Sequence, residues 1–255
     1  MFIPINDHVH HVGLAGSEQA PPLVLLHSLG TSSALWQAQM AAFACSHRVI
    51  CPDFRGHGLS ELSATRLSIE TLAGDMLAIL ETLDISRFAM AGISLGGVVA
   101  QAVAAAAGDR LSGLTLFDSY VLSQNPAMWT DRAAKVRRDG LGAISEAVLS
   151  LWMSPAERAD TDGRGLARML ATTPDEGYAS GCDALANADN RARVGGIHAP
   201  TVVACGALDR AAPPEASRVL AAMIPGARIE IIEGAGHIPV LHHARQCTEI
   251  IRSVL

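Results

Sequence analysis

The chain has 255 residues, of which 49% are hydrophobic and 17% are charged, and its formal net charge at pH 7 is -6. This composition is typical of a compact globular protein rather than a disordered one, and the negative charge provides no basic surface for nucleic acid or an anionic membrane. No apolar run is long enough to cross a bilayer, and the N-terminus lacks the basic region and apolar core of a secretory signal, so we expect a cytoplasmic protein. The length favours one α/β domain with an insertion over two small domains.

The cysteine and histidine patterns favour a protein without a metal site or a cofactor. His8, His10 and His11 accompany two short predicted strands at residues 3–5 and 9–14. They could bind a metal ion, but no fourth ligand is nearby, and such a group is more often a solvated strand face. The cysteines are odd in number, widely spaced and absent from exposed turns, so we expect buried, reduced thiols at Cys45, Cys51, Cys182, Cys205 and Cys247.

The first part of the chain alternates between predicted strands and helices. A buried strand at residues 22–27 leads through a polar loop to a helix at residues 33–44. A second strand at residues 48–52 and a helix at residues 69–83, capped by Ser68, follow. This alternation predicts a parallel sheet covered by helices.

The turn at residues 53–60 contains a histidine that could be mistaken for a catalytic base. The segment is polar and punctuated by glycine, as tight turns are. We interpret His57 as structural, because Asp53, Arg55 and Ser60 can satisfy it locally and another histidine is better placed downstream.

Residues 90–97, Met-Ala-Gly-Ile-Ser-Leu-Gly-Gly, form the most informative motif of the chain. They join a predicted strand at residues 86–92 to a helix of small residues through Gly-x-Ser-x-Gly. A serine in so sharp a turn adopts strained backbone angles that project its Oγ above the sheet. Gly92 and Gly96 flank it because a Cβ at either position would collide with the strand or the helix. The motif therefore presents Ser94 as a nucleophile.

The regular alternation stops after a predicted strand at residues 111–117. The following segment contains frequent Gly, Pro and Asp and predicts short helices at residues 131–139, 143–152, 155–159, 165–171 and 175–187. We interpret residues 121–193 as a helical cap, or lid, that shapes a substrate pocket and excludes water from it.

The sheet resumes after this insertion. Strands are expected at residues 200–205 and 228–232, a helix at residues 214–223 lies between them, and a last helix covers about residues 240–254. The expected fold is α/β, with a mostly parallel eight-stranded sheet covered by helices on both faces and a helical cap inserted after strand 6. The core domain would comprise residues 1–120 and 194–255.

Three polar residues follow predicted strands in the order Ser94, Asp209, His237. Each lies at the C-terminal end of its strand, the edge at which open α/β sheets place their active sites. Because a neutral serine hydroxyl is a weak nucleophile, His237 would take its proton, while Asp209 would fix the imidazole tautomer and stabilise the imidazolium. Asp118 also follows a strand and competes for the role of the acid. We favour Asp209, because its Gly-x-x-Asp-x-x-x-Pro loop can turn toward His237, and we expect Asp118 nearer the cap entrance.

The order Ser, Asp, His is that of the α/β-hydrolases, and the chain resembles this superfamily over essentially its whole length. The resemblance implies an oxyanion hole made of two backbone N–H groups, one from the loop after the strand at residues 22–27 and one from the residue after the nucleophile. These positions are Leu29 and Leu95.

Motifs beyond the core resemble those of 3-oxoadipate enol-lactonases. The matching stretches are His27-Ser28-Leu29-Gly30-Thr31, Arg55-Gly56-His57-Gly58, Gly92-Ile93-Ser94-Leu95-Gly96-Gly97, Trp129-Thr130-Asp131-Arg132, Gly177-Tyr178-Ala179 and Ala207-Leu208-Asp209-Arg210-Ala211-Ala212-Pro213-Pro214. The chain departs from them at His242 and His243, where such proteins usually carry a glutamate. The resemblance implies a cofactor-free serine hydrolase that opens a small enol-lactone of aromatic catabolism through an acyl-serine intermediate.

An enol-lactone of this kind carries a free carboxylate, which a protein of negative net charge repels unless a local cation receives it. Arg132 and Lys135 lie on one face of a predicted helix in the cap. Arg132 follows Trp129 by one turn, and its guanidinium could hold a carboxylate beside an aromatic wall. We therefore expect Trp129 and Arg132 to bind substrate.

Other functions fit the same core motifs. A carboxylesterase or a perhydrolase would use the same three residues, and a receptor for small lactones can retain them while turning over slowly. We expect a small-molecule lactone or ester as the only binding partner, without nucleic acid or membrane, and a monomer or small homo-oligomer.

Overall fold

The structure, a computed structural model, describes residues 1–6, 8–63 and 66–255. In these ranges the strands form one sheet with the order β1-β2-β4-β3-β5-β6-β7-β8. β2 is antiparallel to both of its neighbours, and the remaining pairs are parallel, as the sequence predicts. The strands are β1 Phe2–Ile5, β2 His8–Ala15, β3 Pro22–Leu26, β4 Arg48–Pro52, β5 Phe88–Ile93, β6 Leu111–Phe117, β7 Thr201–Gly206 and β8 Arg228–Ile232.

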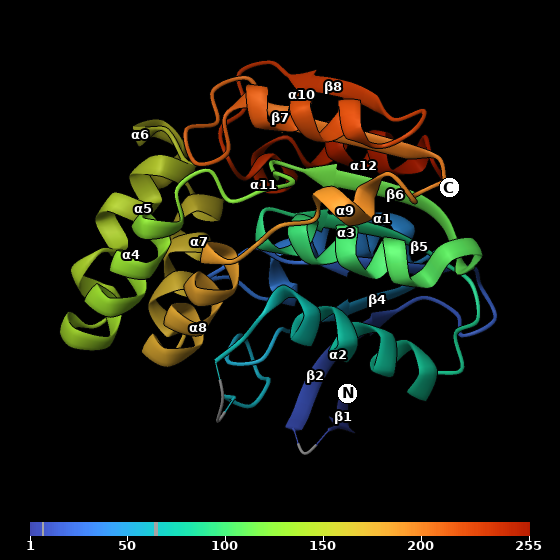
Figure 1. Cartoon of the computed structure of the whole chain (residues 1–255), viewed down its shortest axis with the longest axis horizontal. Coiled ribbons are helices and arrows are strands. Elements are labelled where there is room, and N and C mark those ends of the chain that lie inside the picture. The colour runs from blue at the N-terminus through green and yellow to red at the C-terminus, as the bar shows by residue number, and fades with distance from the viewer. Residues whose placement is uncertain (7, 64–65) are drawn as a thin grey trace.

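Helices cover both faces of this sheet (Figure 1). α2 and α3 pack together on one face, and α1 and α12 pack together on the other. The central strands β5 and β7 are buried at every residue, which explains why they are continuous apolar runs rather than alternating ones. The helices that lie on or near the sheet are α1 Gln37–Phe43, α2 Ile69–Thr82, α3 Leu95–Ala107, α9 Arg191–Val194, α10 Pro214–Met223, α11 Pro239–His242 and α12 Ala244–Arg252, with short 3₁₀ helices at Ser33–Trp36 and Gly108–Arg110.

A group of helices lies to one side of the sheet, at the left of Figure 1, inserted between β6 and β7. It has the position of the predicted cap. α4 begins five residues earlier than expected, because the Asn125 side chain accepts from the Met128 N–H and Pro126 suits the first turn. α7 likewise begins early, where Asp160 caps it. The helices are α4 Pro126–Asp139, α5 Ser145–Trp152, α6 Pro155–Ala159, α7 Thr161–Thr172 and α8 Asp175–Ala186, with a 3₁₀ helix at Leu141–Ala143.

The C-terminal segment differs from the prediction. Instead of one helix over residues 240–254, α11 ends at His242 and α12 begins at Ala244, with His243 between them at φ -115° and ψ 35°. The side chain of Gln39, from α1, donates to the carbonyl of Val240 at 3.1 Å and to that of Ala244 at 3.2 Å. The Val240 carbonyl would otherwise accept the Ala244 N–H in a continuous helix, so a tertiary hydrogen bond replaces a helical one.

The cysteines are all free, and four of them are buried as expected. Cys45 is exposed, which contradicts the prediction for that residue, because it lies in the surface turn just after α1. Within the described ranges, no helix is both long and apolar enough to cross a membrane.

Candidate active site

Ser94 lies in a strained turn between β5 and α3. Its backbone angles are φ 54° and ψ -118°, a region that side chains other than glycine rarely occupy. A Cβ on Gly92 would lie 2.3 Å from the Gly96 carbonyl oxygen, and a Cβ on Gly96 would lie 2.3 Å from the Leu26 carbonyl oxygen. Both glycines are therefore required for α3 to approach the sheet, as the motif predicts.

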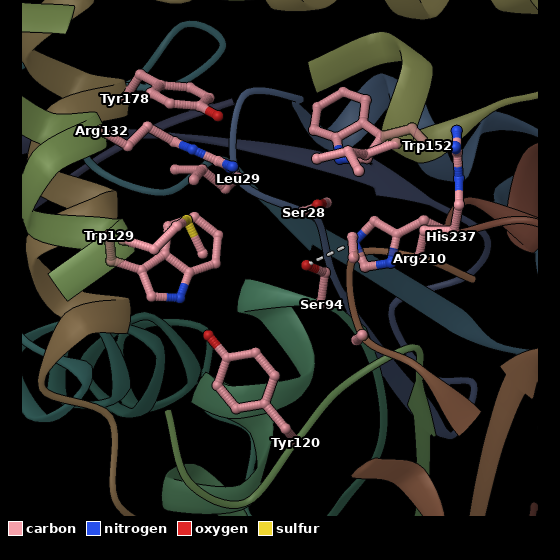
Figure 2. Close-up of a pocket in the computed structure, with 14 residues that line it drawn as sticks. Ser28, Leu29, Ser94, Tyr120, Trp129, Arg132, Trp152, Tyr178, Arg210 and His237 are labelled. Carbon is pink, nitrogen blue, oxygen red and sulfur yellow. Dashed lines mark hydrogen bonds between the residues drawn. The ribbon is translucent and has the colours of Figure 1, made fainter. Parts of the chain in front are cut away.

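The structure brings Ser94, Asp209 and His237 into one hydrogen-bonded series. His237 Nε2 lies 3.0 Å from Ser94 Oγ, a contact that is dashed in Figure 2, and Nδ1 lies 2.8 Å from Asp209 Oδ2. A proton on Nδ1 satisfies Asp209 and leaves Nε2 free to accept the serine proton. The other carboxylate oxygen of Asp209 accepts the N–H groups of Ala211 and Ala212 at 2.7 and 3.0 Å.

The loops after β7 and β8 are packed closely, and this packing aligns Asp209 with His237. The Leu208 N–H donates to the Ala235 carbonyl at 2.9 Å. A Cβ on Gly206 would lie 2.1 Å from the Gly236 carbonyl oxygen, so only glycine fits at the end of β7. The sequence predicts that Asp209 and His237 lie at the same edge of the sheet, and the hydrogen bond between their loops fixes the distance between them.

Asp118 lies elsewhere than expected. It is fully buried at the end of β6 rather than at the cap entrance. Its carboxyl group lies close to Asp209 and His237, because one oxygen or nitrogen atom from each of the three side chains lies within 4.8 Å of the other two. Asp118 Oδ1 accepts the Gly206 N–H at 2.8 Å. Desolvation and then the charge of Asp209 raise the pKa of Asp118 well above its usual range.

A cavity of about 220 Å³ opens in front of Ser94 and His237 (Figure 2). This volume is below the range of about 300–1,000 Å³ typical of sites for drug-sized ligands, so the cavity suits a small molecule. Core loops and cap helices both contribute to it, through Ser28, Leu29, Ser94, Tyr120, Met128, Trp129, Arg132, Leu151, Trp152, Tyr178, Arg210, Ala211, Ala212 and His237.

Arg132 and Trp129 form part of the cap wall of this cavity. The Arg132 guanidinium carbon lies 4.8 Å from the centre of the Trp129 ring, and both side chains are half-buried. Lys135 does not line the cavity and instead pairs with Asp139 at 2.8 Å on the exposed face of α4. Of the two cations expected on one helix face, only Arg132 therefore faces the cavity.

Leu29 and Leu95 occupy the positions expected for backbone donors. Leu29 lines the cavity, and Leu95 is the first residue of α3, whose first N–H groups have no acceptor within the helix. The loop that carries Leu29 is fixed by His27, which donates from Nδ1 to the Ser28 carbonyl at 2.8 Å and accepts the Phe54 N–H on Nε2 at 3.0 Å.

His57 is structural in its contacts, although its partner differs in part from the prediction. Its Nδ1 donates to the main-chain carbonyl of Arg55 at 3.1 Å, while Asp53 and Ser60 bind other groups. Burial, and then the neighbouring His27, lowers the pKa of His57 to about 3. His57 is absent from the wall of the cavity that contains Ser94.

The histidines of β2 form separate contacts. His11 Nδ1 lies 2.8 Å from Asp53 Oδ2, and His8 lies against the guanidinium of Arg55. His10 is fully buried, which contradicts a solvated strand face, because it pairs across the sheet with Ile3 on the inward side. Within the described ranges, the group of potential metal ligands within 4.8 Å of one another is instead that of Asp118, Asp209 and His237.

Sequence reasoning missed several residues of the wall. Tyr120 follows the strand β6, and Tyr178 and Arg210 lie within stretches that matched the family pattern, so their positions offered a signal. No sequence pattern indicated Trp152. Its carbonyl accepts the His237 N–H at 3.1 Å and so joins α5 to the loop after β8 that carries His237, the histidine loop. His242, which stands where the enol-lactonases usually carry a glutamate, lies near two acidic residues of the cap. Its Nδ1 is 3.8 Å from Glu157 Oε1 and its Nε2 is 3.4 Å from Asp160 Oδ2.

Comparisons with known proteins agree with this architecture. Residues 21–244 match the family model described as alpha/beta hydrolase fold. The chain is 31% identical over 242 residues to 3-oxoadipate enol-lactonase 2 of Acinetobacter baylyi, covering 94% of this chain and 90% of that protein. It is 30% identical over 244 residues to a pimeloyl-(acyl-carrier protein) methyl ester esterase of Aeromonas hydrophila, covering 91% and 94%.

A solved structure extends this similarity to three dimensions. The enol-lactonase from Burkholderia xenovorans LB400 superposes with a TM-score of 0.94 at 35% identity, covering 100% of this chain and 99% of that one. With the family match over most of its length, the strained serine turn and the eight-stranded sheet, the chain belongs to the α/β-hydrolase superfamily, and within it the chain resembles the 3-oxoadipate enol-lactonases.

Proposed function

We propose that Ser94, His237 and Asp209 are a catalytic triad that opens a small lactone through an acyl-serine intermediate. Ser94 Oγ attacks the lactone carbonyl while His237 Nε2 takes the hydroxyl proton. The N–H groups of Leu29 and Leu95 donate to the oxyanion of the tetrahedral intermediate. Its collapse breaks the ring C–O bond, and His237 returns the proton to the leaving enol oxygen. Because the substrate is cyclic, this leaving group stays attached to the acyl chain.

Hydrolysis of the acyl enzyme then reverses the roles of the same atoms. His237 takes a proton from water, the hydroxide oxygen attacks the ester carbonyl, and the C–O bond to Ser94 breaks as His237 returns the proton to Oγ. Asp209 keeps the imidazole in the required tautomer in both halves. The product carries a new carboxylate, and its enol tautomerises to the ketone.

The substrate that fits best is a lactone bearing a carboxylate, as 3-oxoadipate enol-lactone does. The observation that carries this choice is the Arg132 guanidinium, stacked on Trp129 in the wall of a small cavity that also contains Ser94. A guanidinium held against a ring is positioned to bind a carboxylate bidentately. The enol-lactonases of similar sequence support the same choice.

The test compares kcat/KM for 3-oxoadipate enol-lactone, a neutral lactone of the same ring size and p-nitrophenyl acetate. We expect the carboxylate-bearing lactone to be preferred by about tenfold or more, which corresponds to about 1.4 kcal/mol. Equal values for the two lactones would refute the substrate assignment while leaving the serine mechanism standing. Stoichiometric binding of the lactone without repeated turnover would favour a receptor.

A second candidate function is that of a carboxylesterase. Two observations support it: the similarity to the methyl ester esterase and a second cavity next to the first. That cavity, of about 540 Å³, shares Leu151, Trp152 and Arg210 with the first. It could receive the alcohol or acyl part of a longer ester. A kcat/KM for linear methyl esters above that for the lactone would favour this function, and perhydrolysis would be measured with the same esters in hydrogen peroxide.

We propose residues 121–193 as the cap of this enzyme and residues 1–120 with 194–255 as its core domain. The cap supplies Trp129, Arg132 and Tyr178 to the cavity, whereas the core supplies Ser94 and His237. Substrate recognition and chemistry would thus belong to different parts of the chain, so the cap can change specificity without altering the triad.

A further inference from the structure

A buried pair of carboxyl groups lies behind His237. Asp118 has 0% exposure and Asp209 4%, and an oxygen of each carboxyl group lies within 4.8 Å of an oxygen of the other. Two negative charges this close in a buried site repel each other, which favours a proton on one carboxyl of the pair.

The distribution of donors decides which carboxyl holds the proton. Asp209 has two backbone N–H donors as well as His237, and all three stabilise a negative charge. Asp118 has the Gly206 N–H on Oδ1, whereas its Oδ2 has no partner among the hydrogen bonds of the described residues. A buried oxygen without a donor favours the neutral acid, whose O–H needs an acceptor.

The other groups around Asp118 do not stabilise a charge on it. Besides Asp209 and His237, the thiols of Cys205 on β7 and Cys247 on α12 lie near Asp118, and because burial raises the pKa of both thiols, neither is charged. The pKa of Asp118 itself is raised by desolvation first and by Asp209 second, against the opposing Gly206 hydrogen bond.

We propose that Asp118 is a neutral carboxylic acid whose O–H donates a hydrogen bond to the Asp209 carboxylate, and that it is a positioning residue for the triad. The bond holds Asp209 in the orientation that His237 needs. It also withdraws charge from Asp209, so that His237 remains neutral and able to accept the Ser94 proton at lower pH than without it. The kinetic part of this proposal rests on the proposed triad, whereas the proton on Asp118 does not.

The first test is unfolding, which needs no substrate. Because folding raises the pKa of Asp118, its contribution to stability is fully present below the unfolded pKa of about 3.9 and is lost as the pH rises toward the folded value. The Asp118→Asn side chain keeps a donor, tolerates the φ of 45° and does not titrate. The Tm of Asp118→Asn relative to the wild type should therefore rise steadily between pH 4 and pH 8.

Asp131→Asn, at an exposed position on α4, is the control and should show no such trend. A Tm difference for Asp118→Asn that stays constant or falls with pH would mean that Asp118 is ionised, and would overturn the proposal. This result is independent of whether the protein hydrolyses any ester or lactone.

The second test is the pH dependence of kcat/KM with p-nitrophenyl acetate, which requires the triad but not Arg132. Asp118→Ala removes the donor, so the acid limb of the profile should move to higher pH and kcat/KM should fall. Asp118→Asn should restore the position of the limb and recover most of that loss. If Asp118 were instead a second ionised acid, Asp118→Asn would remove a negative charge near His237 and move the limb to lower pH by about 1 to 3 units.

Discussion

Arg132→Ala should separate substrate recognition from chemistry. The substitution removes the guanidinium from the cavity wall but leaves Trp129 and the triad in place. A charged hydrogen bond contributes about 1.5–3 kcal/mol, which corresponds to about 10- to 100-fold in affinity. The full value applies because the guanidinium is half-buried and already held 4.8 Å from the Trp129 ring, so little order is lost on binding.

The assay is steady-state kinetics with two substrates, 3-oxoadipate enol-lactone and p-nitrophenyl acetate. We expect KM for the lactone to rise by about 10- to 100-fold in Arg132→Ala, with kcat and the aryl ester kinetics nearly unchanged, since only the lactone carries a carboxylate. Lys135→Ala is the matched control: it removes a cation one turn along α4 that pairs with Asp139 and does not line the cavity. Equal losses on both substrates would refute carboxylate recognition and make Arg132 a support of the cap, and no loss on either would place it outside the binding site.

Two further outcomes concern the triad. Asp209→Asn should lower kcat by about 10⁴-fold, because an amide favours the wrong imidazole tautomer, and this loss should be far larger than that in Asp118→Asn. Comparing kcat of the two variants on p-nitrophenyl acetate checks this. A more severe loss in Asp118→Asn would make Asp118 the acid of the triad. In the wild type, kcat/KM for the same ester should decline as the pH falls from 8 to 5, because protonated His237 cannot accept the serine proton, and a flat profile would exclude a histidine base.

The sequence alone predicted correctly those elements whose bounds depend on a local pattern of residues. The strand at residues 111–117 and the helices at residues 155–159 and 214–223 have the bounds that periodicity, Pro and capping residues predict. Gly92 and Gly96 likewise predicted the strained turn, because the need for a missing Cβ is local.

The remaining features depend on contacts between distant segments. The break at His243 follows from a hydrogen bond of Gln39, about 200 residues away in the sequence, and no pattern within residues 240–254 indicates it. The burial of Asp118 against Asp209 depends on the pairing of β6 with β7, and the place of Trp152 in the cavity depends on how the cap meets the histidine loop. The loop pattern around Asp209 predicted that this carboxyl, rather than that of Asp118, is hydrogen-bonded to His237, but nothing in the sequence indicated that Asp118 lies beside them.

The most direct test of the mechanism is the turnover of 3-oxoadipate enol-lactone by Ser94→Ala. The Ser94 side chain is in contact with the cavity, and its hydroxyl hydrogen bond is to His237, so the variant should fold as the wild type does. Nucleophilic catalysis by Ser94 predicts a loss of about 10⁶-fold in kcat. A Ser94→Ala protein that opens the lactone within about tenfold of the wild-type rate would contradict it, because the reaction would then proceed without the acyl-serine.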